Sequence, residues 1–96
     1  MNFQIIPSKT FLRQLEKVDE KSKKIISDKI QLIKENPFRY KKIYSKSFSK
    51  VFRIRLKIQS KETRMIYIVT QKIILVCLLD RKKDYKDLEK YLSKIT

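Results

Sequence analysis

The 96-residue chain contains no glycine, no histidine and no tryptophan, and it has one cysteine and two prolines. Without histidine, and with a single thiol, neither a His-dependent catalytic triad nor a zinc site of His and Cys ligands is expected. Without glycine, no glycine-rich loop is available to cradle a phosphate. We therefore expect a protein that holds no metal ion and no cofactor.

Long apolar segments are missing as well. The longest run, Ile73 to Leu79, has the length of a strand, whereas a membrane-spanning helix needs about 20 residues. The first residues lack the basic and long apolar regions of a secretion signal. A cytoplasmic protein without a membrane partner is the resulting expectation. Cys77 lies inside the apolar run, so we interpret it as a core thiol, because burial disfavours a reactive thiolate.

Acidic residues are scarce, since 10 Asp and Glu stand against 25 Lys and Arg, giving a formal net charge of +15. A surface of that charge attracts polyanions, and the attraction weakens as salt rises. An AT-rich code would also enrich a chain in lysine, so the charge has two explanations. Coding bias explains arginine less well, and four arginines fall in the C-terminal half: Arg53, Arg55, Arg64 and Arg81.

The first 40 residues predict a strand and two helices. A short apolar segment ends at Pro7, which cannot donate a ladder hydrogen bond. Two amphipathic helices follow, with Ser8 and Asp19 as N-caps. The second helix is expected to end at Asn36-Pro37, because the residue before proline is pushed out of the helical region.

The remaining residues predict a sheet and a last helix. Strands are expected around residues 42–44, 51–58, 63–70 and 73–79, paired antiparallel because their connections are short. Asp84 is the expected cap of the final helix. The predicted fold class is a single α+β domain over residues 1–96: an N-terminal strand, a two-helix hairpin, an antiparallel three- to four-stranded sheet and a short C-terminal helix.

The strand at 51–58 carries the candidate site. Alternation places Arg53, Arg55 and Lys57 opposite its apolar residues, and neighbours on one face are about 7 Å apart, near the spacing of successive nucleotide phosphates. Arg64 begins the next strand and Arg81 follows the one after, so these cations are expected to meet on one open face. Tyr85 would add a ring for stacking or a phenol for hydrogen bonding. From spacing alone, the cations could equally well solvate an exposed face.

Three segments resemble, in order and spacing, the core motifs of the RelE/ParE toxin superfamily and its RelE-like branch. They are Val51-Phe52-Arg53-Ile54-Arg55-Leu56, Thr63-Arg64-Met65-Ile66-Tyr67 and Asp80-Arg81-Lys82-Lys83-Asp84-Tyr85. The helix hairpin ending at Asn36-Pro37 matches the same order of elements. The resemblance covers nearly the whole chain and implies a RelE-like domain.

The resemblance also implies a function. It implies a toxin of a type II toxin-antitoxin system that cuts messenger RNA on the ribosome, without a metal, and is neutralised by an antitoxin protein. In that branch the 2′-hydroxyl attacks its neighbouring phosphate, while basic side chains hold the phosphate and protonate the leaving group. The implied catalytic residues are Arg64, Arg81 and Tyr85, and the implied RNA-binding residues are Arg53, Arg55, Lys57, Lys82 and Lys83.

Two departures from the motifs leave alternatives open. Asp80 stands where a histidine is frequent, and arginine replaces the lysine of some relatives at Arg53 and Arg55. Arginine is a poor general base, so proton removal would fall to Tyr85, Lys57, Lys83 or the ribosome itself. The alternatives are a ParE-like inhibitor of DNA gyrase without nuclease activity, and an inactive relative that binds RNA or ribosomes.

Overall fold

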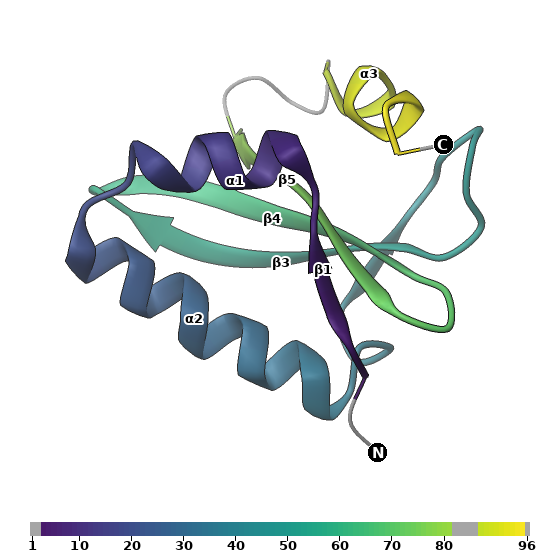
Figure 1. Ribbon diagram of the computed structural model, residues 1–96, viewed down its shortest axis with the longest axis horizontal. Helices are drawn as coiled ribbons and strands as arrows, with labels where there is room; N and C mark the ends of the chain where they lie inside the picture. Colours follow the sequence, from purple (N-terminus) through teal and green to yellow (C-terminus); the bar gives the residue numbers. More distant parts are fainter. Residues whose placement is uncertain (1–2, 82–86, 96) are drawn as a thin grey trace.

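The computed structural model of the protein describes residues 3–81 and 87–95. The elements in chain order are β1 (Ile5–Pro7), α1 (Lys9–Glu16), α2 (Glu20–Glu35), β2 (Lys41–Ile43), β3 (Val51–Ile58), β4 (Lys61–Val69), β5 (Ile73–Asp80) and α3 (Leu88–Ser93). The strands form one sheet in the order β1-β5-β4-β3-β2 (Figure 1). Strands β2 to β5 pair antiparallel, and β1 joins the sheet as a fifth strand parallel to β5. The predicted α+β class and order of elements are confirmed.

Both predicted helix caps are present at the helix hairpin. The Ser8 side chain accepts a hydrogen bond from the Phe11 amide at 3.0 Å, and the Asp19 carboxylate accepts one from the Ser22 amide at 2.9 Å. The hydrogen bonds with Ser22 lower the pKa of Asp19. Helix α2 ends at Asn36 as expected. These caps satisfy amide groups that a helix start leaves without partners.

Strands β3 and β4 form a long hairpin whose turn is tighter than expected. The predicted turn at residues 59–62 is only Gln59 and Ser60, with φ angles of 51° and 64°, and β4 begins already at Lys61. Two successive residues at positive φ are typical of the turn that matches the twist of a two-residue hairpin. The sequence predicted a turn here but not its two-residue form, because neither residue is the glycine or asparagine typical of positive φ.

Strand β5 lies beside β1 for three residues only, and side chains from the start of the chain bond its remaining edge. Ser8 donates to the Val76 carbonyl at 2.6 Å. The Gln14 amide donates to the Leu78 carbonyl at 2.9 Å and accepts from the Leu78 amide at 2.7 Å. Gln14 therefore replaces a neighbouring strand at this point, which protects backbone groups that an edge would otherwise expose.

The pairing of β4 with β5 contains one irregularity. Ile66 is opposite Cys77 and Tyr67 is opposite Leu75, so Val76 is an extra residue of β5. Such a bulge places two residues of one strand against one position of its neighbour.

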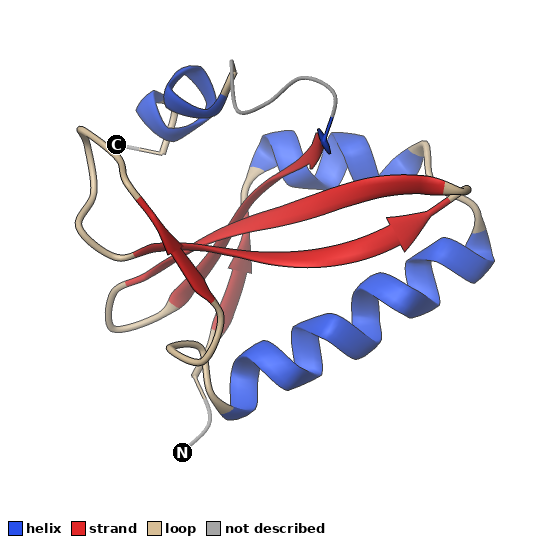
Figure 2. Ribbon diagram, turned by 180° about the vertical axis from the view of Figure 1, so that it is seen from behind, coloured by secondary structure: helices blue, strands red, loops and turns tan. Residues whose placement is uncertain are grey.

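The sheet separates two apolar clusters. The first joins α1 and α2 to one face and includes Phe11, Ile26, Ile33, Phe52, Ile54, Leu56, Tyr67 and Leu75. The second joins α3 to the opposite face and includes Val51, Ile66, Ile68, Val76, Cys77, Leu79, Leu88 and Leu92. Figure 2 shows α3 apart from the other two helices. Each fully buried large apolar side chain contributes about 1.5–3 kcal/mol, so both clusters hold the sheet.

The C-terminal helix is described from Leu88, after Asp87. The predicted cap Asp84 lies outside the described residues. Strand β5 is buried on both faces, as its unbroken apolar run predicts. Within residues 3–81 and 87–95, no helix is both long enough and apolar enough to cross a membrane.

Candidate nucleic-acid interface

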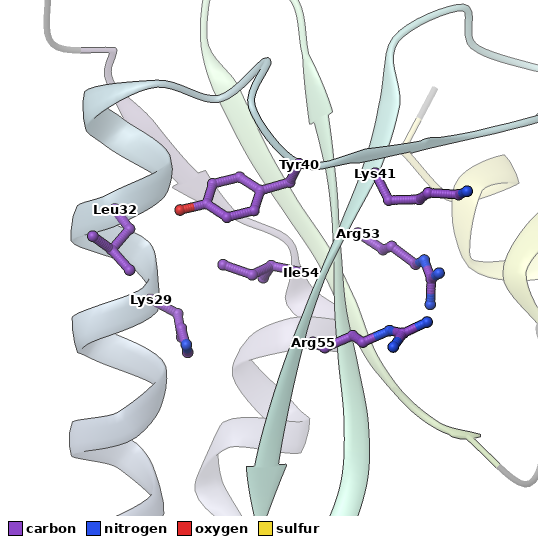
Figure 3. Close-up of a pocket in the computed structure, with 7 residues that line it drawn as sticks. All are labelled: Lys29, Leu32, Tyr40, Lys41, Arg53, Ile54 and Arg55. Atoms are coloured by element: carbon purple, nitrogen blue, oxygen red, sulfur yellow. The ribbon is translucent and has the colours of Figure 1, made fainter.

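The cations of β3 stand on the sheet face that α3 covers only in part. Arg53 and Arg55 point to the same side of the strand, away from Tyr40 and Leu32 (Figure 3). Their neighbours Phe52, Ile54 and Leu56 pack in the first apolar cluster on the other side. The strict alternation of this strand therefore separates core from cations, as predicted.

Strand pairing extends this set across the sheet. Lys41 of β2 is the cross-strand partner of Arg53, and Arg64 of β4 is the partner of Arg55. Directly opposite residues in antiparallel strands are about 4.5–5.5 Å apart at Cα. The pairing therefore brings Arg55 and Arg64 side by side on neighbouring strands, where an anion between them would contact both.

Two hollows connect these residues. A groove of about 470 Å³ is lined by Lys41, Arg53 and Arg55, and at its other wall by Lys29, Leu32, Tyr40 and Ile54 (Figure 3). A narrow cleft of about 20 Å³ is lined by Arg55, Arg64 and Arg81 together with Glu62 and Thr63. Arg55 belongs to both. We call Lys41, Arg53, Arg55, Arg64 and Arg81 the cation row.

The guanidinium of Arg53 has an unusual environment. Its Nη1 nitrogen is buried and makes no hydrogen bond with the described residues, although the side chain as a whole is only half-buried. A buried donor without an acceptor costs about 1–3 kcal/mol. An oxygen-rich anion that reaches this nitrogen would remove that cost, and guanidinium groups bind phosphate oxygens in a bidentate manner.

Carboxylates are few around the cation row. The ion pair between Lys23 and Glu20 lies on α2, away from the sheet face. Glu62 shares the cleft with Arg55, and Asp80 and Arg81 line an adjoining hollow of about 540 Å³ with Ser60 and Lys61. The region as a whole therefore carries a strong excess of positive charge.

The predicted site residues fall into three groups. Arg55, Arg64 and Arg81 line one cleft, and Arg53 lies beside them in the adjoining groove. Lys57 is exposed on β3 opposite Glu62, and it lines neither hollow. Tyr85, Lys82 and Lys83 lie outside the described residues. The expected convergence of arginines therefore holds for four residues, and their functional roles remain predictions.

Lys41 was missed by the sequence reasoning. It belongs to the three-residue strand β2, which is too short to show a period, so nothing in the sequence indicated on which face it lies. Its pairing with Arg53 places it in the groove. The Lys41-Lys42 pair was the available signal, and it is not specific.

Two titratable groups with strongly shifted pKa values belong to the core and not to this region. Burial, with a smaller effect of Asp87, raises the pKa of the Cys77 thiol to about 12. Burial also raises the pKa of Tyr67 well above its usual value, and its hydroxyl donates to the Pro37 carbonyl at 2.6 Å. The interpretation of Cys77 as a buried core thiol is confirmed.

The fold can now be compared with known proteins. No family model matches the sequence, and no curated protein is similar to it in sequence. Solved structures are similar in fold. A double arginine-to-alanine variant of the E. coli toxin RelE in the free state aligns with a TM-score of 0.77 and 15% identity over 100% of both chains. The isolated E. coli RelE toxin aligns with a TM-score of 0.68 and 13% identity over 98% of this chain and 99% of that one.

A third structure is the intact E. coli RelBE toxin-antitoxin complex. A chain of that complex aligns with a TM-score of 0.63 and 14% identity over 81% of this chain and 95% of its own length. These likenesses define the class of the molecule as an α+β protein with a RelE-like fold. The resemblance that the motifs indicated is thus confirmed at the level of the fold.

Proposed function

We propose that this protein is the toxin of a type II toxin-antitoxin system and that it cuts messenger RNA bound to the ribosome. One observation carries the proposal: Arg55, Arg64 and Arg81, from three different strands or strand ends, line one cleft beside Arg53. The RelE-like fold supports it independently. The net charge of +15 favours a polyanionic substrate.

The proposed reaction needs no oxidant and no water. The 2′-oxygen of one nucleotide attacks the adjacent phosphorus, the bond from phosphorus to the 5′-oxygen breaks, and the products are a cyclic phosphate and a 5′-hydroxyl. The 2′-hydroxyl proton passes to a base, and the leaving 5′-oxygen receives a proton from a protonated basic side chain of the site. Guanidinium groups placed around the phosphate stabilise the negative charge that develops on its oxygens. Removing one such donor costs about 2.7–4 kcal/mol in comparable sites.

The arginines and the proton-accepting group have different proposed roles. Arg64 and Arg81 hold the reacting phosphate, and Arg53 and Arg55 hold the neighbouring backbone. Arginine stays protonated, so it does not take the 2′-hydroxyl proton. That step falls to Tyr85, to a lysine such as Lys57 or Lys83, or to a group of the ribosome.

The proposal includes an antitoxin as partner. This chain has 25 basic and 10 acidic residues, so an acidic protein that covers the cation row would be complementary to it in charge. The similarity to a chain of a toxin-antitoxin complex supports this partner. We expect the antitoxin, encoded by a neighbouring gene, to bind this protein more weakly as the salt concentration rises.

The test is a translation extract supplied with purified protein and a defined message. New 5′ ends within the translated region, absent when ribosomes are omitted, are the expected result. Arg13→Ala is a matched control for Arg81→Ala, since it removes the same charge from an exposed position on α1. Intact message together with normal protein synthesis would contradict the proposal. Inhibition of DNA supercoiling under the same conditions would support the gyrase alternative instead.

A further inference from the structure

The loop between β2 and β3 presents an aromatic ring to solvent. The side chain of Tyr44 is 83% exposed, more than any other large apolar side chain of the described residues. Within the same part of the chain it makes no hydrogen bond or ring contact. Large exposed aromatics are uncommon and mark sites of interaction more often than smaller side chains do.

Packing and hydrogen bonds hold this loop in place. Ile43 and Phe48, on either side of Tyr44, pack against the apolar cluster under α3. The Ser45 hydroxyl accepts hydrogen bonds from the amides of Ser47 and Phe48 at 3.0 and 3.3 Å. The anchored neighbours therefore leave Tyr44 as the outward residue of an ordered turn.

Helix α3 fixes the loop from the other side. The Glu89 carboxylate accepts a hydrogen bond from the Lys46 amide at 3.1 Å and one from the Ser47 hydroxyl at 3.4 Å. This contact links positions 42 or more residues apart in the chain. The helix that covers part of this sheet face therefore also anchors the loop that carries the ring.

The loop that carries Tyr44 begins beside the cation row. Lys41 of β2 is opposite Arg53 and Ile43 is opposite Val51, and Tyr44 is the first residue after the strand. Ile43 and Phe48 anchor the loop on the sheet face of α3 and the cation row. The Cα atoms of Lys41 and Tyr44 are three residues apart and therefore at most about 10 Å from each other, or between one and two nucleotides of an extended strand.

The surroundings of the ring are basic. Residues 40–50 contain no Asp or Glu, and Lys41, Lys42 and Lys46 are exposed, whereas the Lys50 ammonium lies over the Phe38 ring and the Glu89 carboxylate contacts the loop. Proteins bind single-stranded nucleic acid with exposed rings on basic surfaces, because cations contact the backbone and the ring stacks on a base.

We infer that Tyr44 stacks on an unpaired RNA base one or two nucleotides away from the phosphates held by Arg53 and Arg55. The inference rests on the proposed function, because it names how that site would hold its RNA. Stacking adds affinity with little preference among bases, since every base has a π-face. The ring would act as a positioning residue and would not touch the reacting phosphate.

The experiment measures the binding of a fluorescently labelled, single-stranded ten-nucleotide RNA at low salt. Tyr44→Ala should weaken binding about fivefold to a hundredfold, the range expected for loss of one stacked base. Tyr44→Phe keeps the ring and should stay within about twofold of the wild type. The slope of affinity against salt should be unchanged in both variants, because no phosphate contact is lost.

A second RNA separates stacking from other effects. On an oligonucleotide whose bases are replaced by abasic sites, Tyr44→Ala should bind as the wild type does. Arg53→Ala should weaken binding to both RNAs and lower the salt slope. If Tyr44→Ala binds base-containing RNA like the wild type while Arg53→Ala does not, the inference is wrong and the proposed function stands. If the wild type binds neither RNA, the inference fails, and message cleavage in the translation extract decides the proposed function separately.

Discussion

One face of the sheet is covered by α1 and α2, whereas the opposite face is shared between α3 and the cation row. The covered face joins Phe52, Ile54 and Leu56 of β3 to the helices in one apolar cluster. On the other face, Val51 of the same strand packs under α3, and Arg53 and Arg55 line one wall of a groove whose opposite wall includes Lys29 and Leu32 of α2. The difference teaches that stability and proposed function are separated within single strands, by alternation at every second residue.

The largest effect is expected on the covered face. Phe52→Ala removes a ring that stacks on Tyr67 at 5.6 Å between centroids and meets Phe38 edge-on at 5.9 Å. Loss of a buried phenylalanine costs about 3–5 kcal/mol. Urea unfolding followed by circular dichroism should show this loss. A decrease under about 1 kcal/mol would mean that this face is not the main core.

The cation face should behave in the opposite way. Arg64→Ala and Arg81→Ala should each slow message cleavage by about a hundredfold to a thousandfold, which corresponds to about 2.7–4 kcal/mol of transition-state stabilisation. Arg81→Ala should leave the unfolding midpoint nearly unchanged, because the side chain is exposed. Growth arrest on expression and mapping of message ends measure the activity. Full activity in both variants would break the comparison.

Cys77 links stability to pH on the α3 side of the sheet. Its pKa is raised from 9.0 to about 12, because burial disfavours the thiolate. The folded state therefore keeps its proton where the unfolded state loses it, and this contribution is complete below pH 9 and falls as pH rises toward 12. The free energy of unfolding should fall by about 1.4 kcal/mol per pH unit in that window from this group.

A matched variant isolates the thiol. Cys77→Val removes the titrating group, so its unfolding free energy should fall less steeply between pH 9 and 12 than that of the wild type. The native thiol should also resist a disulfide-exchange reagent until the protein unfolds. Parallel pH curves for the two proteins would contradict the assignment.

A smaller effect is expected at the edge of β5. Gln14→Leu removes both hydrogen bonds to the Leu78 backbone and should cost about 1–3 kcal/mol of stability. Gln14→Glu keeps an acceptor for the Leu78 amide but loses the donor to its carbonyl, so an intermediate loss is expected. Neither variant should alter cleavage once the protein is folded, and the translation extract measures this directly.

The sequence predicts the parts of this molecule in which local pattern and tertiary structure agree. Strand β3 was predicted with its observed bounds, because its apolar and basic residues alternate without a break. Ser8 and Asp19 were predicted as caps from residue type alone. The same alternation predicted that Arg53 and Arg55 share a face, which the structure confirms.

Other features depend on contacts that no local pattern encodes. The parallel pairing of β1 with β5 joins residues far apart in the chain. The two bonds from Gln14 to Leu78 span 64 residues, and glutamine on a helix is normally solvent-exposed. Lys41 joined the cation row only through its pairing with Arg53. Long-range pairing therefore sets the parts of the site that sequence reasoning missed.

The extra residue in β5 exchanges the faces of the sheet to which the side chains after it point. Before Val76, the odd-numbered Ile73 and Leu75 pack toward α1 and α2; after it, the odd-numbered Cys77 and Leu79 pack toward α3. Since a shift of one residue exchanges the two faces of a strand, Arg81 reaches the cleft of Arg55 and Arg64 because of this single insertion. Without it, the same arginine would lie on the side of α1 and α2, and the cleft would lose one of its three arginines.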